Sequence, residues 1–331
     1  MRESGYPPAM GNENGDPPSQ AAEPADTSSW IKMALPWFCA AGVIAYLLWY
    51  VPLGEVWVAI SEAEVFWYLP LILLSVLYWF LLDSFAFSYL ISRFNTPLSW
   101  QEARGMRGVT YWIAALNWNA GTAAIVLYLN RLKEVRPLQS ASSLLFYSMF
   151  DAVILASTAF IGAFFLEEGV VRASVLSVSA LFVLGNVVFF LVLINQRPQW
   201  TWLEKVRQWS VFSSHQKSIP RDFGVLLAIR SAYLAGFVAC FLLGASTFEI
   251  HVPLGLGMAS VPVIMLMGAL PISPAGLGTQ AAAMLFFWSD SGSAASIVAY
   301  GLVFPISLTV ARMVVGIPYV RDFRRLTSGE G

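Results

Sequence analysis

The chain has 331 residues, of which 57% are hydrophobic and only 12% are charged. Soluble domains carry about 25% charged residues, and the mean hydropathy of +0.65 places most of the surface against lipid rather than water. The 19 Lys and Arg residues against 20 Asp and Glu residues give a net charge of -1, which excludes the overall basic excess of a nucleic-acid-binding protein. We expect no nucleic-acid partner.

Residues that carry metal or redox chemistry are scarce. The only cysteines are Cys39 and Cys240, both inside apolar runs, and the only histidines are His215 and His251, in separate polar segments. This spacing excludes a disulfide framework and a zinc site, and it offers no convincing catalytic set. The sequence therefore predicts no metal, no cofactor and no enzymatic activity.

The chain divides by composition into a tail and a membrane domain. Residues 1–30 are rich in Pro, Gly, Asn, Ser and acidic residues, and they cannot bury enough apolar surface to order themselves. We therefore expect a disordered tail at 1–30, a transmembrane domain at 31–320 and a short cytoplasmic tail at 321–331.

Apolar runs show where the chain enters the membrane. A helix needs about 20 apolar residues to cross, and such runs cover 33–51, 66–91, 109–129, 141–166, 174–195, 223–245, 257–288 and 294–317. Two of them are interrupted, one by Asn117–Thr122 and the other by Pro271–Gly278. Broken helices are tolerated at membrane depth only where protein or a wet cavity satisfies the freed backbone groups. We expect these two segments to be re-entrant hairpins.

The distribution of positive charge supports this reading. If all eight runs cross the membrane, the loops on the two sides carry 9 and 8 Lys or Arg residues, which is no bias. If the two broken segments return to the side they entered from, 16 basic residues lie inside and only Arg172 lies outside. Because cytoplasmic loops are enriched in Lys and Arg, the second topology is favoured, with both termini cytoplasmic. The alternative is eight crossing helices, two of them kinked.

The predicted fold is thus an all-α, polytopic membrane protein. It has six spanning helices and two opposed re-entrant helical hairpins. The second half, 174–317, repeats the order of the first half, 33–166, upside down. Inverted repeats with broken helices that meet near the midplane are typical of transporters.

Four ionisable residues fall inside predicted spans: Asp83, Asp151, Arg230 and Arg312. Each lies roughly seven to ten residues from the cytoplasmic end of its span, a common depth of ~10–15 Å at 1.5 Å per residue. They are read either as structural ion pairs, with Arg312 reaching to the headgroups, or as a polar chamber. In the chamber, an arginine grips a lipid phosphate while the carboxylates orient it.

Polar residues at the two breaks complete the predicted substrate-binding set. Asn117 and Asn119 lie at the first hairpin tip, and neutral amides bond hydroxyl or phosphate oxygens without adding charge; amides also join membrane helices. At the second break we expect the turn to form an opposite gate, with Ser273, Gly276, Gly278 and Gln280.

The stretch Leu270–Ala282, with its Pro271–Gly278 turn, resembles the late signature of the lysylphosphatidylglycerol synthase transmembrane-region family, also described as flippase-like integral membrane proteins. The polar broken helix, basic loop and helix with Asp151 also look like the family's earlier pattern. The chain departs from that pattern at Thr122, Ile125, Ser148 and Ala281, where family members carry charged residues. The resemblance implies a protein of prokaryotic membranes that moves or handles phospholipids or polyprenyl-linked lipids.

We therefore expect a multi-pass protein of the prokaryotic cytoplasmic membrane that acts as a lipid translocase or lipid-handling protein. One alternative is a non-catalytic accessory module for a lipid-modifying or glycosyl-transferring enzyme, which would then be its partner. A transporter of small solutes or ions is the third reading.

Overall fold

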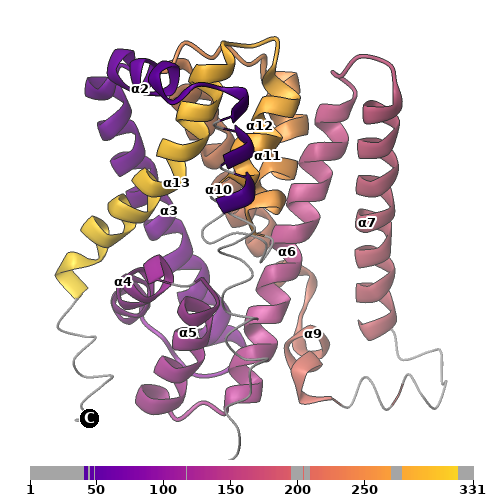
Figure 1. Ribbon diagram of the computed structural model, residues 1–331. Helices are drawn as coiled ribbons and strands as arrows, with labels where there is room; N and C mark the ends of the chain where they lie inside the picture. Colours follow the sequence, from indigo (N-terminus) through magenta and orange to yellow (C-terminus); the bar gives the residue numbers. More distant parts are fainter. Residues whose placement is uncertain are drawn as a thin grey trace, which may run out of the picture.

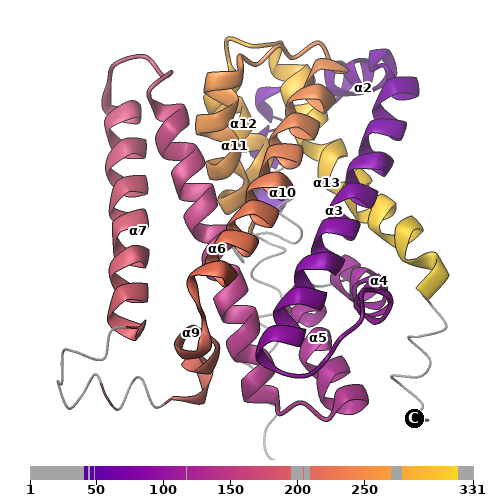
Figure 2. The same cartoon turned by 180° about the vertical axis from the view of Figure 1, so that it is seen from behind.

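The computed structural model describes residues 41–319, apart from 44, 48, 117, 195–203, 205–208 and 270–277, and for 115, 116, 118, 119, 194 and 269 it describes only the backbone. The predicted tails, 1–30 and 321–331, and about half of the first predicted span, 33–51, lie outside these ranges. Over the described part the regular structure is entirely helical (Figures 1 and 2), as the composition predicts.

Five described helices are long and apolar enough to cross a membrane. They are α3 (Val65–Phe94), α6 (Pro137–Ala163), α7 (Val170–Ile194), α10 (Pro220–Ser246) and α13 (Ala294–Gly316), which continues into the short helix η3 (Ile317–Tyr319). Their outer faces carry large apolar side chains such as Phe66, Leu181 and Leu243, each more than half exposed. A surface of this kind is stable in lipid rather than in water. The chain is therefore a multi-pass membrane protein.

Two pairs of shorter helices replace the two broken segments. The first pair is α4 (Trp100–Leu116) with α5 (Trp118–Lys133), and the second is α11 (Leu254–Ala269) with α12 (Thr279–Trp288). The helices of each pair pack against each other. In Figures 1 and 2 the two pairs lie in opposite halves of the molecule.

The remaining helices are short. Helix α2 (Leu53–Glu62), absent from the sequence prediction, precedes α3 and packs against α13; η1 (Ser210–Phe212) and α9 (Ser213–Lys217) precede α10. With ten residues α2 is too short to span a bilayer. A scan for long apolar runs therefore misses it.

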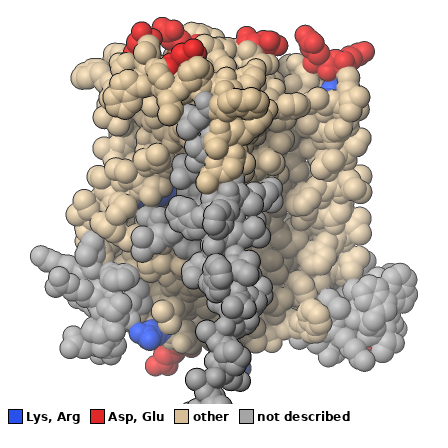
Figure 3. All heavy atoms as spheres, in the orientation of Figure 1, with Lys and Arg blue, Asp and Glu red and all other residues tan. Residues whose placement is uncertain are grey.

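Charge separates the two ends of the molecule. One end, here the acidic end, carries Glu55, Glu62, Glu64, Glu167, Glu168, Glu249 and Asp290, and Figure 3 shows acidic groups along that edge. The other, the basic end, carries Arg93, Arg131, Lys133, Arg136, Lys217 and Arg221. Helices α4 and α5 lie towards the basic end, and α11 and α12 lie towards the acidic end (Figure 1).

The helix contacts follow a regular scheme. Helix α3 packs on α10, α4 packs on α13, and α11 packs on α6. Helix α3 also packs on α13 and α10 on α6, while α5 packs on α6 and α12 on α13. Exchanging α3 with α10, α4 with α11, α5 with α12 and α6 with α13 therefore maps the α3–α10 contact onto itself and each of the other contacts onto another one.

Tight packing at one crossing depends on a glycine. A Cβ added to Gly162 of α6 would overlap the backbone of α11 at Met258 and Ala259, with the Ala259 Cα only 2.7 Å away. The α6–α11 crossing therefore brings two backbones together, as small residues allow in membrane helices.

Short helix α9 is held to the basic end of α6 by buried polar and aromatic contacts. Ser214 lies 3.1 Å (Oγ to Oγ) from Ser143. The ring of His215 is fully buried, its Nε2 is 3.0 Å from Met149 Sδ, and Phe146 lies at 5.0 Å between ring centroids. Because burial disfavours the charged imidazolium, the pKa of His215 is lowered to about 4.

Candidate functional site

A carboxylate inside the membrane domain is shared by two arginines. Asp83 lies on the buried stripe of α3 that also holds Phe80 and Phe87, and its side chain is 5% exposed. Its Oδ2 is 2.6 Å from Arg107 Nη2 of α4, and its Oδ1 is 2.9 Å from Arg230 Nη1 of α10. Asp83 thus joins the first pair of short helices to the opposite half of the chain.

Helix α6 completes the arrangement with two residues one turn apart. The Tyr147 hydroxyl donates to Asp83 Oδ1 at 2.8 Å and accepts from Arg230 Nη1 at 2.6 Å. Asp151 forms an ion pair through Oδ1 with Nε of Arg230. Asp83, Arg107, Tyr147, Asp151 and Arg230, referred to below as the charge cluster, thus connect α3, α4, α6 and α10.

Aromatic rings surround the two guanidinium groups. The Arg107 Cζ lies 5.0 Å from the Tyr111 ring centroid, and the Arg230 Cζ lies 4.0 Å from that of Tyr233 and 4.7 Å from that of Tyr147. Aromatic faces attract a cation while excluding water. The rings therefore hold the guanidinium groups in place without neutralising them.

The charge cluster lies at the boundary between two apolar cores. On α3, Phe80 belongs to the core towards the acidic end, whereas Phe87 belongs to the core towards the basic end. Arg230 likewise falls between Ile229 of one core and Leu234 of the other. Two aspartates and two arginines balance formally at this boundary, which avoids the several kcal/mol that an unpaired buried ion costs.

The charge cluster is open on one side. The side chain of Asp151 is 31% exposed, against 5% for Asp83 and 10% for Arg230. The more exposed carboxylate, that of Asp151, pairs with Arg230. Because a guanidinium presents several donors in a fixed fork, it can bind phosphate or carboxylate oxygens in pairs.

Sequence reasoning identified three members of the charge cluster, namely Asp83, Asp151 and Arg230. It missed Arg107 and Tyr147. The apolar run begins at residue 109, but α4 begins at Trp100, so Arg107 lies inside a helix rather than in a loop. No short sequence pattern links Asp83 with Arg107, because the two residues meet only when α4 packs on α3.

Arg312 is not a member of the charge cluster. It is partly buried on α13, within electrostatic range of Tyr111 and Tyr233, the two tyrosines whose rings border the charge cluster. Arg107, rather than Arg312, is the second arginine on Asp83.

The predicted residues of the first hairpin tip are only partly described. Asn117 lies outside the described residues, and Asn119 is described only as backbone of α5. Helices α4 and α5, the two arms of this hairpin, meet closely beside the tip, where a Cβ on Gly121 would lie 2.6 Å from the Cβ of Ala114. At the basic end the arms are joined by an ion pair of 2.5 Å between Lys133 Nζ and Glu102 Oε1.

In the second hairpin, Ser273 and Gly276 also lie outside the described residues. Gly278 is described and caps α12 with φ 85°, a left-handed backbone that favours glycine. Gln280 lies across Gly268 of α11, where any side chain would overlap it. The Gln280 Oε1 is buried with no partner among the described residues, so this oxygen can accept a hydrogen bond at the hairpin.

No group of three or more His, Cys, Asp or Glu side chains within the described ranges is placed to hold a metal ion.

The comparison with protein families identifies the fold's relatives. The family model described as "Lysylphosphatidylglycerol synthase TM region" matches residues 34–316. The chain belongs to this family. The match covers every described helix up to α13 and agrees with the resemblance seen in the Pro271–Gly278 turn; no curated protein matches the chain. The chain is therefore an integral membrane protein of a lipid-related family.

Proposed function

We propose that this protein is a non-enzymatic lipid translocase or lipid-handling protein that binds a phosphate-bearing headgroup at the charge cluster. The observation that carries the proposal is the Asp83 carboxylate held between Arg107 and Arg230. A lipid phosphodiester has the charge and paired oxygens of such a carboxylate. It can therefore bind the same guanidinium groups.

The substrate class follows from this chemistry. Phospholipids and polyprenyl-linked lipids share an anionic phosphate on an apolar chain, and the arginines recognise the shared part. Asp151 is the exposed member, so the headgroup takes the place of Asp151 at Arg230. The displaced carboxylate then accepts hydrogen bonds from polar groups of the lipid.

We interpret the helix contacts as an inverted repeat, an arrangement that favours transport. The exchange of α3, α4, α5 and α6 with α10, α11, α12 and α13 preserves the pattern of helix contacts. The two short-helix pairs lie in opposite halves of the molecule (Figure 1). Two re-entrant hairpins related in this way, with a charged site between the halves, have the architecture that alternating access uses.

The charge distribution supports an orientation. By the positive-inside rule the basic end faces the cytoplasm, which places the charge cluster nearer to the cytoplasmic leaflet and both termini in the cytoplasm. The topology is tested with single cysteines at Gln101, Leu132 and Glu168, in a chain whose Cys39 and Cys240 are alanine. Impermeant thiol reagents should label the first two from one side and the third from the other. Labelling of Gln101→Cys and Leu132→Cys from opposite sides would refute the re-entrant hairpin.

Transport is tested in liposomes with removal of a neutral pair. The variant Arg230→Met with Asp151→Leu removes one positive and one negative charge, and it leaves Asp83 bonded to Arg107. It should fold, because apolar replacement of a buried pair is often neutral, yet lose transport of fluorescent phosphatidylglycerol or polyprenyl phosphate. The matched control is Glu102→Gln with Lys133→Met, which removes a more exposed pair and should transport normally. A stable first variant with full transport would exclude the ligand role.

The family description favours one second candidate, since it names the transmembrane region of a synthase. In this reading the chain is an accessory module that holds a lipid-modifying or glycosyl-transferring enzyme. The purified protein would then move no lipid in liposomes, and the enzyme would copurify with it from gently solubilised membranes.

A further inference from the structure

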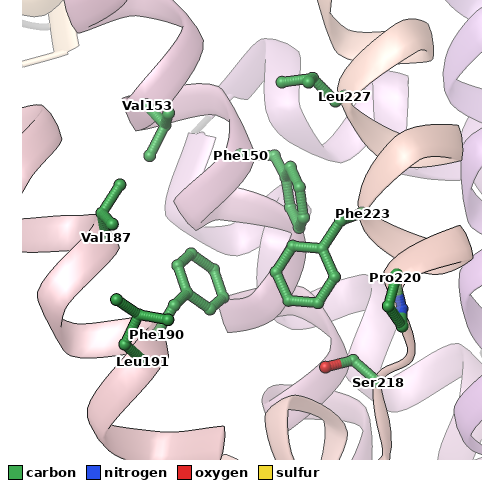
Figure 4. Close-up of a pocket in the computed structure, with 9 residues that line it drawn as sticks. All are labelled: Phe150, Val153, Val187, Phe190, Leu191, Ser218, Pro220, Phe223 and Leu227. Atoms are coloured by element: carbon green, nitrogen blue, oxygen red, sulfur yellow. The ribbon is translucent and has the colours of Figure 1, made fainter.

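A groove separate from the charge cluster lies between α6, α7 and α10 (Figure 4). It has a volume of about 500 Å³, within the range of roughly 300–1,000 Å³ that is typical of small-molecule sites. All of its lining side chains except one are apolar: Phe150, Val153, Val187, Phe190, Leu191, Ser218, Pro220, Phe223 and Leu227.

The groove exists because α7 stands apart from the rest of the helices. Helix α7 packs on α6 and α9, and α10 packs on α6. The rings of Phe190 on α7 and Phe223 on α10 both lie against Phe150 of α6, and Figures 1 and 2 show α7 at the side of the molecule. Only 11% of the apolar stretch of α7 is buried. Aromatic side chains therefore border the space between α7 and α10, and no further helix fills it.

The position of the groove determines what can occupy it. Both α7 and α10 are candidate spans, and the lining residues lie in the parts of these helices nearer the basic end. Apolar walls at membrane depth gain dispersion contacts from hydrocarbon and none from a void. The occupant that is always present at this depth is a lipid acyl chain.

The mouth of the groove adds a charge preference. Ser218, the one polar lining residue, donates its hydroxyl to the His215 carbonyl at 2.6 Å, so the hydroxyl is satisfied within the protein. Lys217 and Arg221 flank the mouth with exposed side chains. Two cations at the membrane surface attract an anionic headgroup.

The inner end of the groove reaches towards the charge cluster. Phe150 directly precedes Asp151 on α6, and Leu227 lies one helical turn before Arg230 on α10. Figure 4 shows Val153 and Leu227 at the end of the groove opposite Ser218. A lipid whose headgroup lies at the mouth would extend its chain towards Arg230, while the headgroup stays roughly 13 Å away, because Arg221 and Arg230 lie nine residues apart on α10 at 1.5 Å per residue.

We propose that this groove binds one acyl chain of an anionic phospholipid whose headgroup contacts Lys217 and Arg221. The groove holds the lipid at the basic end before the headgroup moves to the charge cluster, and this role rests on the proposed lipid handling. The binding itself does not, since it can be measured without transport.

The test uses phosphatidylglycerol with a photoreactive diazirine on one acyl chain, in liposomes of phosphatidylcholine that contain the full chain. Cross-links mapped by mass spectrometry should concentrate on the groove-lining parts of α7 and α10. The variant Val187→Trp fills the groove and should remove most of these cross-links. The matched control, Val188→Trp, changes the neighbouring exposed position on α7 and should leave them unchanged.

The headgroup preference is tested with Lys217→Gln and Arg221→Gln together. Each basic residue near an anionic surface contributes about fivefold, so the double change should lower the preference for phosphatidylglycerol over phosphatidylcholine by up to about 30-fold. Chain cross-linking in pure phosphatidylcholine should persist in this variant. An unaltered preference would overturn the headgroup contact.

The outcomes separate this inference from the proposed function. Cross-links spread evenly over α7, or equal loss in the Val187→Trp and Val188→Trp variants, would mean ordinary surrounding lipid and would overturn the groove. Groove cross-links that persist in a protein without transport would retain the groove and refute the translocase. The Arg230→Met with Asp151→Leu variant should keep the groove cross-links while losing transport.

Discussion

Removal of the Asp83 charge should destabilise the protein far more than removal of an exposed carboxylate. In Asp83→Asn the side chain keeps its shape, but two guanidinium groups lose their shared counter-ion and an amide donor faces one of them. Asp83 is 4% exposed, so water cannot replace the lost charge. Breaking a buried pair from one side typically costs about 3–5 kcal/mol.

The matched control is Glu102→Gln. Glu102 also pairs with a cation, and this hydrogen bond to Lys133 lowers its pKa, but its side chain is 41% exposed. Exposed pairs contribute about 0–1 kcal/mol. The two variants therefore differ in burial while each loses one paired carboxylate.

The assay is thermal unfolding in detergent followed by tryptophan fluorescence, which the 13 Trp residues make sensitive. At about 2–4 °C per kcal/mol for large domains, Asp83→Asn should lower Tm by on the order of 10 °C, and Glu102→Gln by about 4 °C or less. Equal shifts in the two variants would refute the reasoning. A charge that can be removed at no cost is not holding the two halves together.

Three further predictions test separate features. Unfolded His215 titrates near its usual value of about 6.5 and folded His215 near 4, so stability should fall by up to about 3 kcal/mol as pH drops from 6.5 to 4; His215→Phe should flatten a urea-denaturation series across that window. Gly162→Ala should cost about 1–3 kcal/mol through overpacking against α11, whereas Gly185→Ala on α7, where nothing lies within 4 Å of the added carbon, should be neutral or stabilising by up to about 1 kcal/mol in thermal melts. Ser99 caps α4 reciprocally with Glu102, so Ser99→Ala should cost about 0.5–2 kcal/mol; an unchanged Tm would show that the cap contributes nothing to the fold.

The sequence predicted the architecture well because the bilayer restricts it. Five of the six expected spans appear as long apolar helices, and both broken runs appear as pairs of short helices. A long hydrophobic run and a Pro- or Gly-rich interruption are local signals. Helix α2 gave no such signal, because a ten-residue helix satisfies its backbone without a long apolar run.

The sequence predicted only those site residues that their depth along a spanning helix was sufficient to identify. Asp83, Asp151 and Arg230 lie on long straight spans, so counting residues from the helix ends placed them in one layer. The same count cannot tell which way a side chain points around its helix. For that reason it could not exclude Arg312, on α13. It left Arg107 in a loop, because only the packing of α4 brings Arg107 to Asp83.

General energetics give no stability reason for the charge cluster. Buried ion pairs replaced by apolar side chains of similar volume often leave stability unchanged or raise it, so packing alone gives no reason for two arginines and two aspartates at this boundary. The structure lets this be tested pair by pair, because Asp83 with Arg107 and Asp151 with Arg230 are each formally neutral. If Asp83→Leu with Arg107→Met melts like the unaltered protein while Asp83→Asn alone does not, the charges are dispensable for folding. Their remaining role is then to bind an anion, and loss of lipid transport in a stable double variant is the result that would show it.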